Sequence, residues 1–148
     1  MNLNKKFWKN KKVFITGHTG FKGSWLTLIL KVLGAKIYGY ALNPISKPNF
    51  FDGLRLSKFL EKDYRNNIQD LKKLKIAIKR TKPSVVIHLA AQSSVFVSYL
   101  DPIDTIKSNV VGTMNILEAI RQEKSVKVGV IITTDKVYLN LEKKKKFK

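Results

Sequence analysis

Thr16-Gly17-His18-Thr19-Gly20-Phe21-Lys22-Gly23 is the stretch of sequence that decides the fold. An apolar run, Val13-Phe14-Ile15-Thr16, stops at its first glycine, as a buried strand does. Residues 24–33 then carry apolar side chains at helical spacing, and Gly34 ends the predicted helix. The three glycines permit a tight turn, backbone approach to a pyrophosphate, and close packing of helix on strand. We therefore predict a strand, turn and helix whose N-terminus faces the phosphates of a dinucleotide, rather than a glycine-rich turn without a ligand.

The rest of the chain alternates predicted strands with predicted helices. We expect strands over residues 36–42, 63–66, 85–89 and 127–133, helices over 54–60, 70–81 and 101–122, and a loop over 43–53. The apolar side chains are Trp25, Leu28, Ile29, Val32 and Leu33 on the first helix, and Leu71, Leu74, Ile76 and Ile78 are expected to be buried on the helix over 70–81. Such alternation predicts right-handed crossovers and a parallel sheet. The expected fold is α/β: a Rossmann-like, doubly wound sheet of five parallel strands in the order 3-2-1-4-5, truncated before the last strands.

Composition narrows the class of protein. The 148 residues contain 44% hydrophobic residues and no cysteine, which is typical of a globular domain from a reducing compartment. No apolar run approaches the roughly 20 residues that span a bilayer, and no apolar stretch follows the basic start. The net charge of +19 is spread over the ends and over expected helix faces, without interleaved aromatic residues. We expect a cytoplasmic protein with no nucleic-acid partner, no membrane association and no bound metal.

The spacing of the glycine motif resembles the T-G-x-x-G-[FY]-x-G fingerprint of the extended short-chain dehydrogenase/reductase family of nucleotide-sugar epimerases and dehydratases. Within that family, nearly the whole chain resembles the front portion of the CDP-glucose 4,6-dehydratases. The matching segments are Phe7-Trp8, residues 16–26, His88-Leu89-Ala90-Ala91-Gln92, Ser98-Tyr99, Asp101-Pro102, Asn109-Val110, Gly112-Thr113, Leu117-Glu118-Ala119, residues 133–136, Tyr138, Asn140 and Glu142. The resemblance implies NAD as cofactor, a nucleotide sugar as substrate, and homo-oligomers of the full-length enzyme.

The resemblance also implies which residues contact the cofactor, with residues 1–148 as an incomplete NAD-binding domain that lacks its substrate domain. These residues are Thr16, Gly17, Thr19, Gly20, Phe21, Lys22, Gly23, Asn67, Ile68, Leu89, Ala90, Ala91 and Asn109. Asn67 replaces the first acid of the family's D-[IL]-x-D adenine turn. No acid follows the strand over 36–42, where an NAD site usually binds the ribose hydroxyls, so the residues alone do not separate NAD from NADP. Ala90 and Ala91 permit either backbone approach to the cofactor or close helix packing. His88, inside a strand, is expected to be a core histidine rather than a catalytic base.

Thr134-Asp135-Lys136 follows the last predicted strand and resembles the [ST]-D-K motif of the CDP-glucose type. By resemblance, Thr134 hydrogen-bonds the C4 hydroxyl of the sugar, Asp135 protonates the departing C6 hydroxyl, and Lys136 helps with the proton at C5. Water leaves poorly unless it is protonated as it departs, which is why the reaction needs such an acid. The alternative is an ordinary polar strand end. The implied reaction is the lyase conversion of CDP-glucose to CDP-4-keto-6-deoxyglucose.

The family's Tyr-x-x-x-Lys pair is absent, because none of the five tyrosines is followed four residues later by lysine. We therefore expect a fragment, a truncated gene product or one piece of a split enzyme, inactive alone. Two other functions stay open. One is an epimerase or reductase of the same family, and the other is a non-catalytic dinucleotide-binding or regulatory module.

Overall fold

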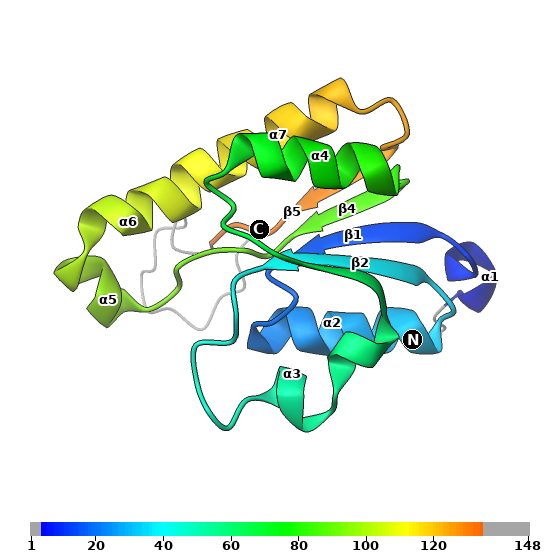
Figure 1. Ribbon diagram of the computed structural model, residues 1–148, viewed down its shortest axis with the longest axis horizontal. Helices are drawn as coiled ribbons and strands as arrows, with labels where there is room; N and C mark the ends of the chain where they lie inside the picture. Colours follow the sequence, from blue (N-terminus) through cyan, green and yellow to red (C-terminus); the bar gives the residue numbers. More distant parts are fainter. Residues whose placement is uncertain (1–3, 135–148) are drawn as a thin grey trace, which may run out of the picture.

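Within residues 4–134, five strands form one parallel sheet in the order β3-β2-β1-β4-β5 (Figure 1). They are β1 (Lys12–Thr16), β2 (Lys36–Ala41), β3 (Leu60–Arg65), β4 (Val85–His88) and β5 (Val128–Ile131). The computed structural model of the protein describes residues 4–134. The predicted Rossmann-like fold and its strand order are confirmed.

Helices cover both faces of the sheet. They are α1 (Lys5–Trp8), α2 (Phe21–Val32), α3 (Phe50–Gly53), the 3-10 helix η1 (Leu56–Phe59), α4 (Leu71–Thr81), α5 (Val95–Leu100), α6 (Pro102–Ile106), the π-helical segment η2 (Lys107–Val111) and α7 (Gly112–Gln122). Helices α2 and α3 lie on one side of the sheet, and α4 and α7 lie on the other (Figure 1). Within residues 4–134, no helix is both long enough and apolar enough to cross a membrane.

The core is divided by the sheet into two clusters. Phe14 and Val86 point to the side of α4 and α7, where Leu74 and Ile116 complete a cluster of buried side chains. The alternate strand residues point to the side of α2, and this second cluster contains Val13, Ile15, Leu30, Ile37, Val85 and Ile87. Each fully buried aliphatic or aromatic side chain contributes roughly 1.5–3 kcal/mol. The sheet that carries the expected site is therefore anchored on both faces.

Several short elements differ from the prediction. The expected loop over 43–53 contains α3, whose N-terminus is capped by the Asn49 side chain. Helices α1 and α5 were not predicted, and they begin at the side-chain caps Asn4 and Ser94. The helix expected over 101–122 is divided into α6, η2 and α7. Helices of four to six residues carry no periodic apolar pattern, so their existence depends on caps and tertiary contacts.

The buried face of α4 differs from the prediction, and that of α2 was not predicted. On α4, Ile76 is exposed while the neighbouring Ala77 is buried. On α2, the side chains against the sheet are mostly small, namely Gly23, Ser24, Thr27 and Leu30. Trp25 and Val32 are left exposed. Small residues let α2 approach β1 closely, so of the five apolar residues that predicted this helix only Leu33 is buried.

Strand β3 begins at Leu60, three residues earlier than the predicted start at residue 63. Its first residues include Glu61 and Lys62, which are exposed. Because β3 is an edge strand that pairs with β2 alone among the described strands, its side chains need not be apolar.

Candidate functional site

The glycine turn connects β1 to α2 at the carboxyl edge of the sheet. Gly17 takes a positive φ of 74°, and its N–H donates to the Tyr40 carbonyl at 2.9 Å. The Gly20 N–H donates back to the Gly17 carbonyl at 3.1 Å, which closes the turn. Gly20 is the N-cap of α2 and supplies no side-chain cap. The first N–H groups of α2 therefore remain available to an anion such as a phosphate.

The three glycines of the motif serve different purposes. A Cβ on Gly17 would lie 2.7 Å from the Ala90 backbone nitrogen, and a Cβ on Gly23 would overlap the Gly17 carbonyl oxygen. A Cβ on Gly20 would meet only one atom within 4 Å, the Gly17 carbonyl oxygen at 3.4 Å. The fold itself thus requires glycine at positions 17 and 23. At position 20 the protein leaves space beside the backbone, which fits the close approach of a pyrophosphate.

A chain of hydrogen bonds joins the carboxyl ends of β1 and β4 below this turn. The backbone N–H groups of Leu89 and Ala90 donate to Thr16 Oγ1, each at 3.2 Å. The Thr16 hydroxyl is hydrogen-bonded to His88 Nδ1 at 2.6 Å, and His88 Nε2 lies 3.2 Å from the Thr113 hydroxyl. His88 is 2% exposed, and burial lowers its pKa to about 4. It is therefore a neutral core histidine, as predicted.

Asn109 holds the segment that follows β4. Its amide Oδ1 accepts from the Gln92 N–H at 2.8 Å, and its Nδ2 donates to the Gln92 carbonyl at 2.9 Å. Asn109 lies in η2, the π-helical interruption between α6 and α7. The Gln92 side chain continues the contact to Thr105 at 3.0 Å. Because both ends of the Asn109 amide bind backbone, this side chain positions the segment rather than reaching outward.

The segment 89–91 lies between the glycine turn and the Asn109 contact. Ala90 packs against the core cluster on the α4 side, whereas Ala91 is exposed. The Leu89 and Ala90 backbone also lies directly against Gly17. The sequence left open whether Ala90 and Ala91 allow close helix packing or approach to a cofactor. Ala90 is closely packed, whereas Ala91 lies on an open surface.

The predicted adenine turn is built on Asn67 and Ile68. Asn67 Oδ1 accepts from the Gln69 N–H at 2.9 Å, and the Ile68 side chain is buried against Gly112. Asn115 is 8% exposed and donates from Nδ2 to the carbonyls of Ile68 and Gln69, each at 3.0 Å. The sequence analysis missed Asn115, although a lone amide on the apolar face of a helix is a usable signal.

A second missed group lies behind the glycine turn. His18 is fully buried, and its Nε2 lies 3.0 Å from Asp63 Oδ1. The ring rests on Gly39 of β2, where a Cβ would lie 2.6 Å from ring atoms. Asp63 also pairs with Arg65 at 2.6 Å. Partial burial acts to raise the pKa of Asp63, but hydrogen bonds from His18 and Arg65 outweigh it and hold the pKa below its usual value.

The remaining predicted residues are found at the same edge or past it. The Thr19 hydroxyl donates to the Leu42 carbonyl at 3.0 Å, which fastens the turn to the end of β2. Phe21 and Lys22 are exposed on the first turn of α2. Thr134 is exposed three residues past β5, whereas Asp135 and Lys136 lie outside the described residues.

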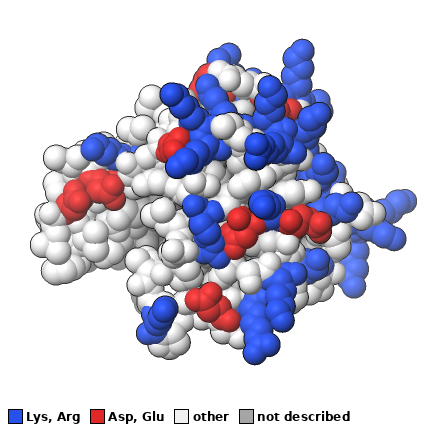
Figure 2. Space-filling model, viewed as in Figure 1, with Lys and Arg blue, Asp and Glu red and all other residues white. Residues whose placement is uncertain are grey.

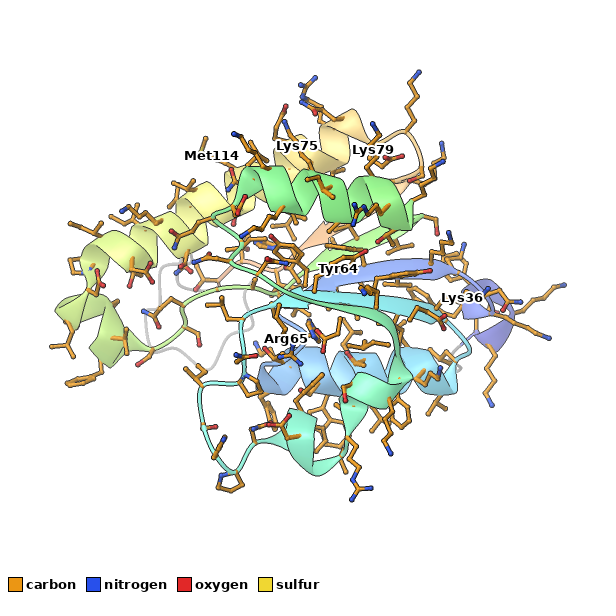
Figure 3. All side chains as sticks on the ribbon, viewed as in Figure 1. Lys36, Tyr64, Arg65, Lys75, Lys79 and Met114 are labelled. Carbon is orange, nitrogen blue, oxygen red and sulfur yellow. The ribbon has the colours of Figure 1, made fainter. Side chains whose placement is uncertain are left out.

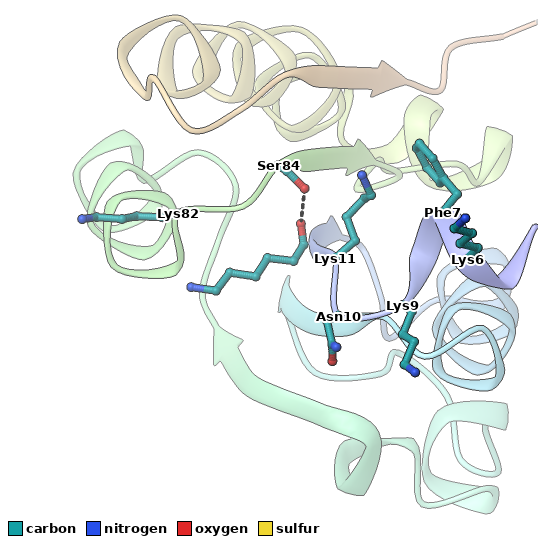
Figure 4. Close-up of a pocket in the computed structure, with 8 residues that line it drawn as sticks. Lys6, Phe7, Lys9, Asn10, Lys11, Lys82 and Ser84 are labelled. Atoms are coloured by element: carbon teal, nitrogen blue, oxygen red, sulfur yellow. Dashed lines mark hydrogen bonds between the residues drawn. The ribbon is translucent and has the colours of Figure 1, made fainter.

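Positive charge gathers at the opposite edge of the sheet. Lysine and arginine side chains cover the right of Figure 2, over α1 and the amino ends of the strands, and are sparse over α5 and α6. A hollow of about 470 Å³ at that amino edge is lined by Lys6, Phe7, Lys9, Asn10, Lys11, Lys12, Lys82 and Ser84. Lys9, Lys11 and Lys82 point away from one another (Figure 4). The hollow is thus remote from the glycine turn, and its cations do not converge on one point.

Comparison with known proteins agrees with this geometry. A family profile described as GDP-mannose 4,6 dehydratase matches residues 14–147, which is most of the chain. The chain belongs to the GDP-mannose 4,6 dehydratase family. Within this family of nucleotide-sugar dehydratases, it is 46% identical over 140 residues to a CDP-glucose 4,6-dehydratase from Salmonella typhimurium. It is also 34% identical over 131 residues to a dTDP-D-glucose 4,6-dehydratase from Dictyostelium discoideum.

Solved structures resemble this member of the GDP-mannose 4,6 dehydratase family in the same way. A UDP-glucose 4-epimerase from Thermus thermophilus, solved in complex with NAD, superposes with a TM-score of 0.66 at 28% identity over 79% of this chain and 36% of its own. The epimerase Mth375 from Methanothermobacter thermautotrophicus reaches a TM-score of 0.75 over 97% of this chain and 41% of its own. Its identity is 23%, so that likeness is one of fold alone.

The chain spans only part of its relatives. It matches over 95% of its own length but covers 39% of the Salmonella enzyme, and it covers 30% of the Dictyostelium enzyme over 86% of its own length. The described residues correspond to the glycine turn, the central sheet and its helices. The activity of the relatives is therefore only proposed for this chain.

Proposed function

We propose that this chain binds NAD at the carboxyl edge of its sheet and is the cofactor-binding part of a nucleotide-sugar 4,6-dehydratase that acts on CDP-glucose. The observation that carries the proposal is the glycine turn. Gly20 leaves open space beside an uncapped helix N-terminus, at the edge where ligands of such sheets bind. The relative with 46% identity is a CDP-glucose 4,6-dehydratase, which supports this substrate.

The residues at the carboxyl edge fit a dinucleotide. The first turn of α2 offers N–H groups to the pyrophosphate beside Gly20. The Asn67–Ile68 turn would lie beside the adenine, and the exposed Ala91 would border the nicotinamide side. When bound, NAD would supply reversible hydride transfer. Asn109 would act by holding the segment that follows β4, since its amide is engaged with Gln92.

Thr134, Asp135 and Lys136 are the proposed catalytic residues. They follow β5 in the sequence, and β5 pairs with β4, whose carboxyl end borders the proposed site. In the proposal, the Thr134 hydroxyl binds the C4 hydroxyl of the sugar. Asp135 delivers a proton to the departing C6 hydroxyl, and Lys136 assists removal of the proton at C5.

A chimera gives a direct test of this function. The 148 residues replace the matching part of the Salmonella enzyme, so that the downstream region of a working relative is supplied. We expect the chimera to convert CDP-glucose to the 4-keto-6-deoxy product with NAD. In the same protein, Asp135→Asn should slow loss of water more than oxidation at C4, so the absorbance of reduced nicotinamide should rise and then decay slowly.

The chimera also separates the rival functions. Formation of a C4 epimer without loss of water would favour an epimerase over a dehydratase. A chimera that folds and binds NAD but leaves several nucleotide sugars unchanged would favour a non-catalytic module. Equal rates of water loss in the chimera and in its Asp135→Asn variant would contradict the proposed role of the acid.

The implied homo-oligomer remains a prediction, and one surface supports it. An exposed apolar row runs along α6, η2 and α7, and Met114 within it projects outward (Figure 3). The row consists of Ile103, Ile106, Val110, Met114 and Leu117, which are 66%, 58%, 53%, 61% and 49% exposed. Residues spaced three to four apart share one helix face, which is suited to packing against another helix.

A further inference from the structure

The end of β2 lacks the acid that usually distinguishes NAD from NADP. Leu42 and Asn43 follow the strand, and both are exposed. In dinucleotide-binding sheets, an acid here binds the ribose hydroxyls of NAD and would repel the 2′-phosphate of NADP. The adenosine ribose is expected beside these residues. Another group must therefore meet its 2′ position.

Arg65 is placed to be that group. It is the last residue of β3 and pairs in register with Ala41, the last residue of β2. Its Nη1 donates to the Leu42 carbonyl at 3.3 Å, the same oxygen that accepts from the Thr19 hydroxyl of the glycine turn. The guanidinium thus lies beside the glycine turn and the end of β2 together.

The guanidinium is held rigidly yet keeps unused donors. Its Nη2 donates to Asp63 at 2.6 Å, and its Cζ lies 5.0 Å from the Phe51 ring centroid. The Arg65 side chain is 30% exposed. A guanidinium has five N–H donors, and only the contacts with Asp63 and Leu42 use them among the described residues. The remaining N–H groups can bind a ligand without disturbing the present contacts.

Asp63 does not act as the missing ribose acid. Its Oδ1 is engaged by the buried His18 and its Oδ2 by Arg65, so both carboxylate oxygens already have partners. The negative charge is largely balanced by the guanidinium beside it. Beside the end of β2, the group available to a ligand is therefore the Arg65 guanidinium rather than the Asp63 carboxylate.

We infer that Arg65 reads the 2′ position of the adenosine ribose and lets this site accept NADP as well as NAD. The inference rests on the proposed function, since it concerns the same cofactor site. A 2′-phosphate would receive charge-assisted N–H bonds from a guanidinium already fixed in place, a geometry in which arginine binds phosphate strongly. The 2′-hydroxyl of NAD would need only one weaker bond.

Titration calorimetry of the 148-residue chain with NAD and with NADP tests the inference. For the unchanged protein we expect the two dissociation constants to lie within about tenfold of each other. Arg65→Met should weaken NADP binding about tenfold or more and NAD binding less than about threefold. Arg65→Lys keeps the charge without the fork and should give an intermediate loss. Asp63→Asn keeps an oxygen for His18, removes the balancing charge, and should shift the preference toward NADP.

The outcomes distinguish this inference from the proposed function. NAD binding with NADP more than about 100-fold weaker would overturn the role of Arg65 and leave the NAD site standing. Equal losses for both cofactors in Arg65→Met and Arg65→Lys, with unchanged circular dichroism, would show that Arg65 does not read the 2′ position. If neither NAD nor NADP bound the folded protein, the proposed function and this inference would both be overturned.

Discussion

At the scale of single residues, His88 links protonation to stability. Its ring is buried between the hydroxyls of Thr16 and Thr113, and burial holds its pKa at about 4 in the folded protein. The ordinary pKa of histidine is about 6.5 in an unfolded chain. Below that pH, His88 binds a proton in the unfolded state but stays neutral in the folded state. The stability that neutral, buried His88 gives the folded protein is therefore fully present above the unfolded pKa and is lost as the pH falls toward 4.

We expect the free energy of unfolding to fall by about 2 kcal/mol between about pH 7.5 and about pH 5 through His88 alone. Urea unfolding at both pH values measures this change. His88→Gln is the control, because glutamine fills similar space and does not titrate. A pH dependence of the same size in both proteins would show that another group is responsible.

Gly39 gives a second residue-scale prediction. Its backbone supports the buried His18 ring, and a Cβ would lie 2.6 Å from ring atoms. Gly39→Ala should reduce the free energy of unfolding by roughly 1–3 kcal/mol, as overpacked cores do. Gly53→Ala is the matched control, because nothing lies within 4 Å of a Cβ there. Equal stabilities of the two variants in urea would contradict the contact between His18 and Gly39.

The glycine motif was predictable from sequence because its spacing reports a turn between a strand and a helix. The partners of His18 were not. Asp63 and Gly39 are far from His18 along the chain, and only the strand pairing brings them together. The difference between Gly20 and Gly23 was also hidden, because it depends on which backbone atoms surround each one.

At the scale of elements, η2 places Asn109 against the segment that follows β4. Asn109→Ala removes both hydrogen bonds to Gln92 and should cost about 1–2 kcal/mol of stability. NAD binding should also weaken severalfold, because the segment at 89–92 loses its support. The measurements are urea unfolding and NAD titration.

Asn49→Ala is the control for that experiment. Asn49 caps α3, so the variant should lose about 1 kcal/mol of stability while NAD affinity stays unchanged. If Asn109→Ala and Asn49→Ala lost stability alike and neither changed NAD binding, Asn109 would have no part in the site.

The bounds of helices and strands were predicted best where the apolar pattern was clear. Strands β1 and β4 were predicted close to their observed bounds because each is a continuous apolar run, and helix α4 because its apolar residues recur at helical spacing. The start of β3 was missed because an edge strand tolerates Glu61 and Lys62. The division of the helix over 101–122 was missed because η2 carries no local breaker such as glycine or proline.

At the scale of the whole molecule, the carboxyl edge with the glycine turn is present without the tyrosine–lysine pair that the dehydrogenase/reductase resemblance implies. None of the five tyrosines in the chain precedes a lysine by four residues. Absence of a general base typically costs ~10²–10⁴ in rate.

The strand order could be predicted because alternating strands and helices leave few allowed arrangements. The two opposite edges of the sheet, one lysine-rich and one with the glycine turn, appeared only once the strands were assembled.

We expect the 148-residue chain to leave CDP-glucose unchanged in the presence of NAD. The measurement is the absorbance of reduced nicotinamide in a single turnover, together with chromatography of the sugar nucleotide. The chimera with the Salmonella relative serves as the active control. Sustained formation of the 4-keto-6-deoxy product by the short chain alone would refute this expectation.

The central claim is that the glycine turn holds NAD, and position 20 tests it most directly because the fold leaves open space there. The measurement is calorimetric titration of NAD into the unchanged chain, Gly20→Val and Gly53→Val. All three should keep the same circular dichroism, since an added Cβ at either position meets nothing closer than the Gly17 carbonyl oxygen, 3.4 Å from position 20. The account predicts that the unchanged chain and Gly53→Val bind NAD alike, while Gly20→Val loses binding because its side chain occupies the place of the pyrophosphate. Equal NAD affinity in all three proteins would contradict it.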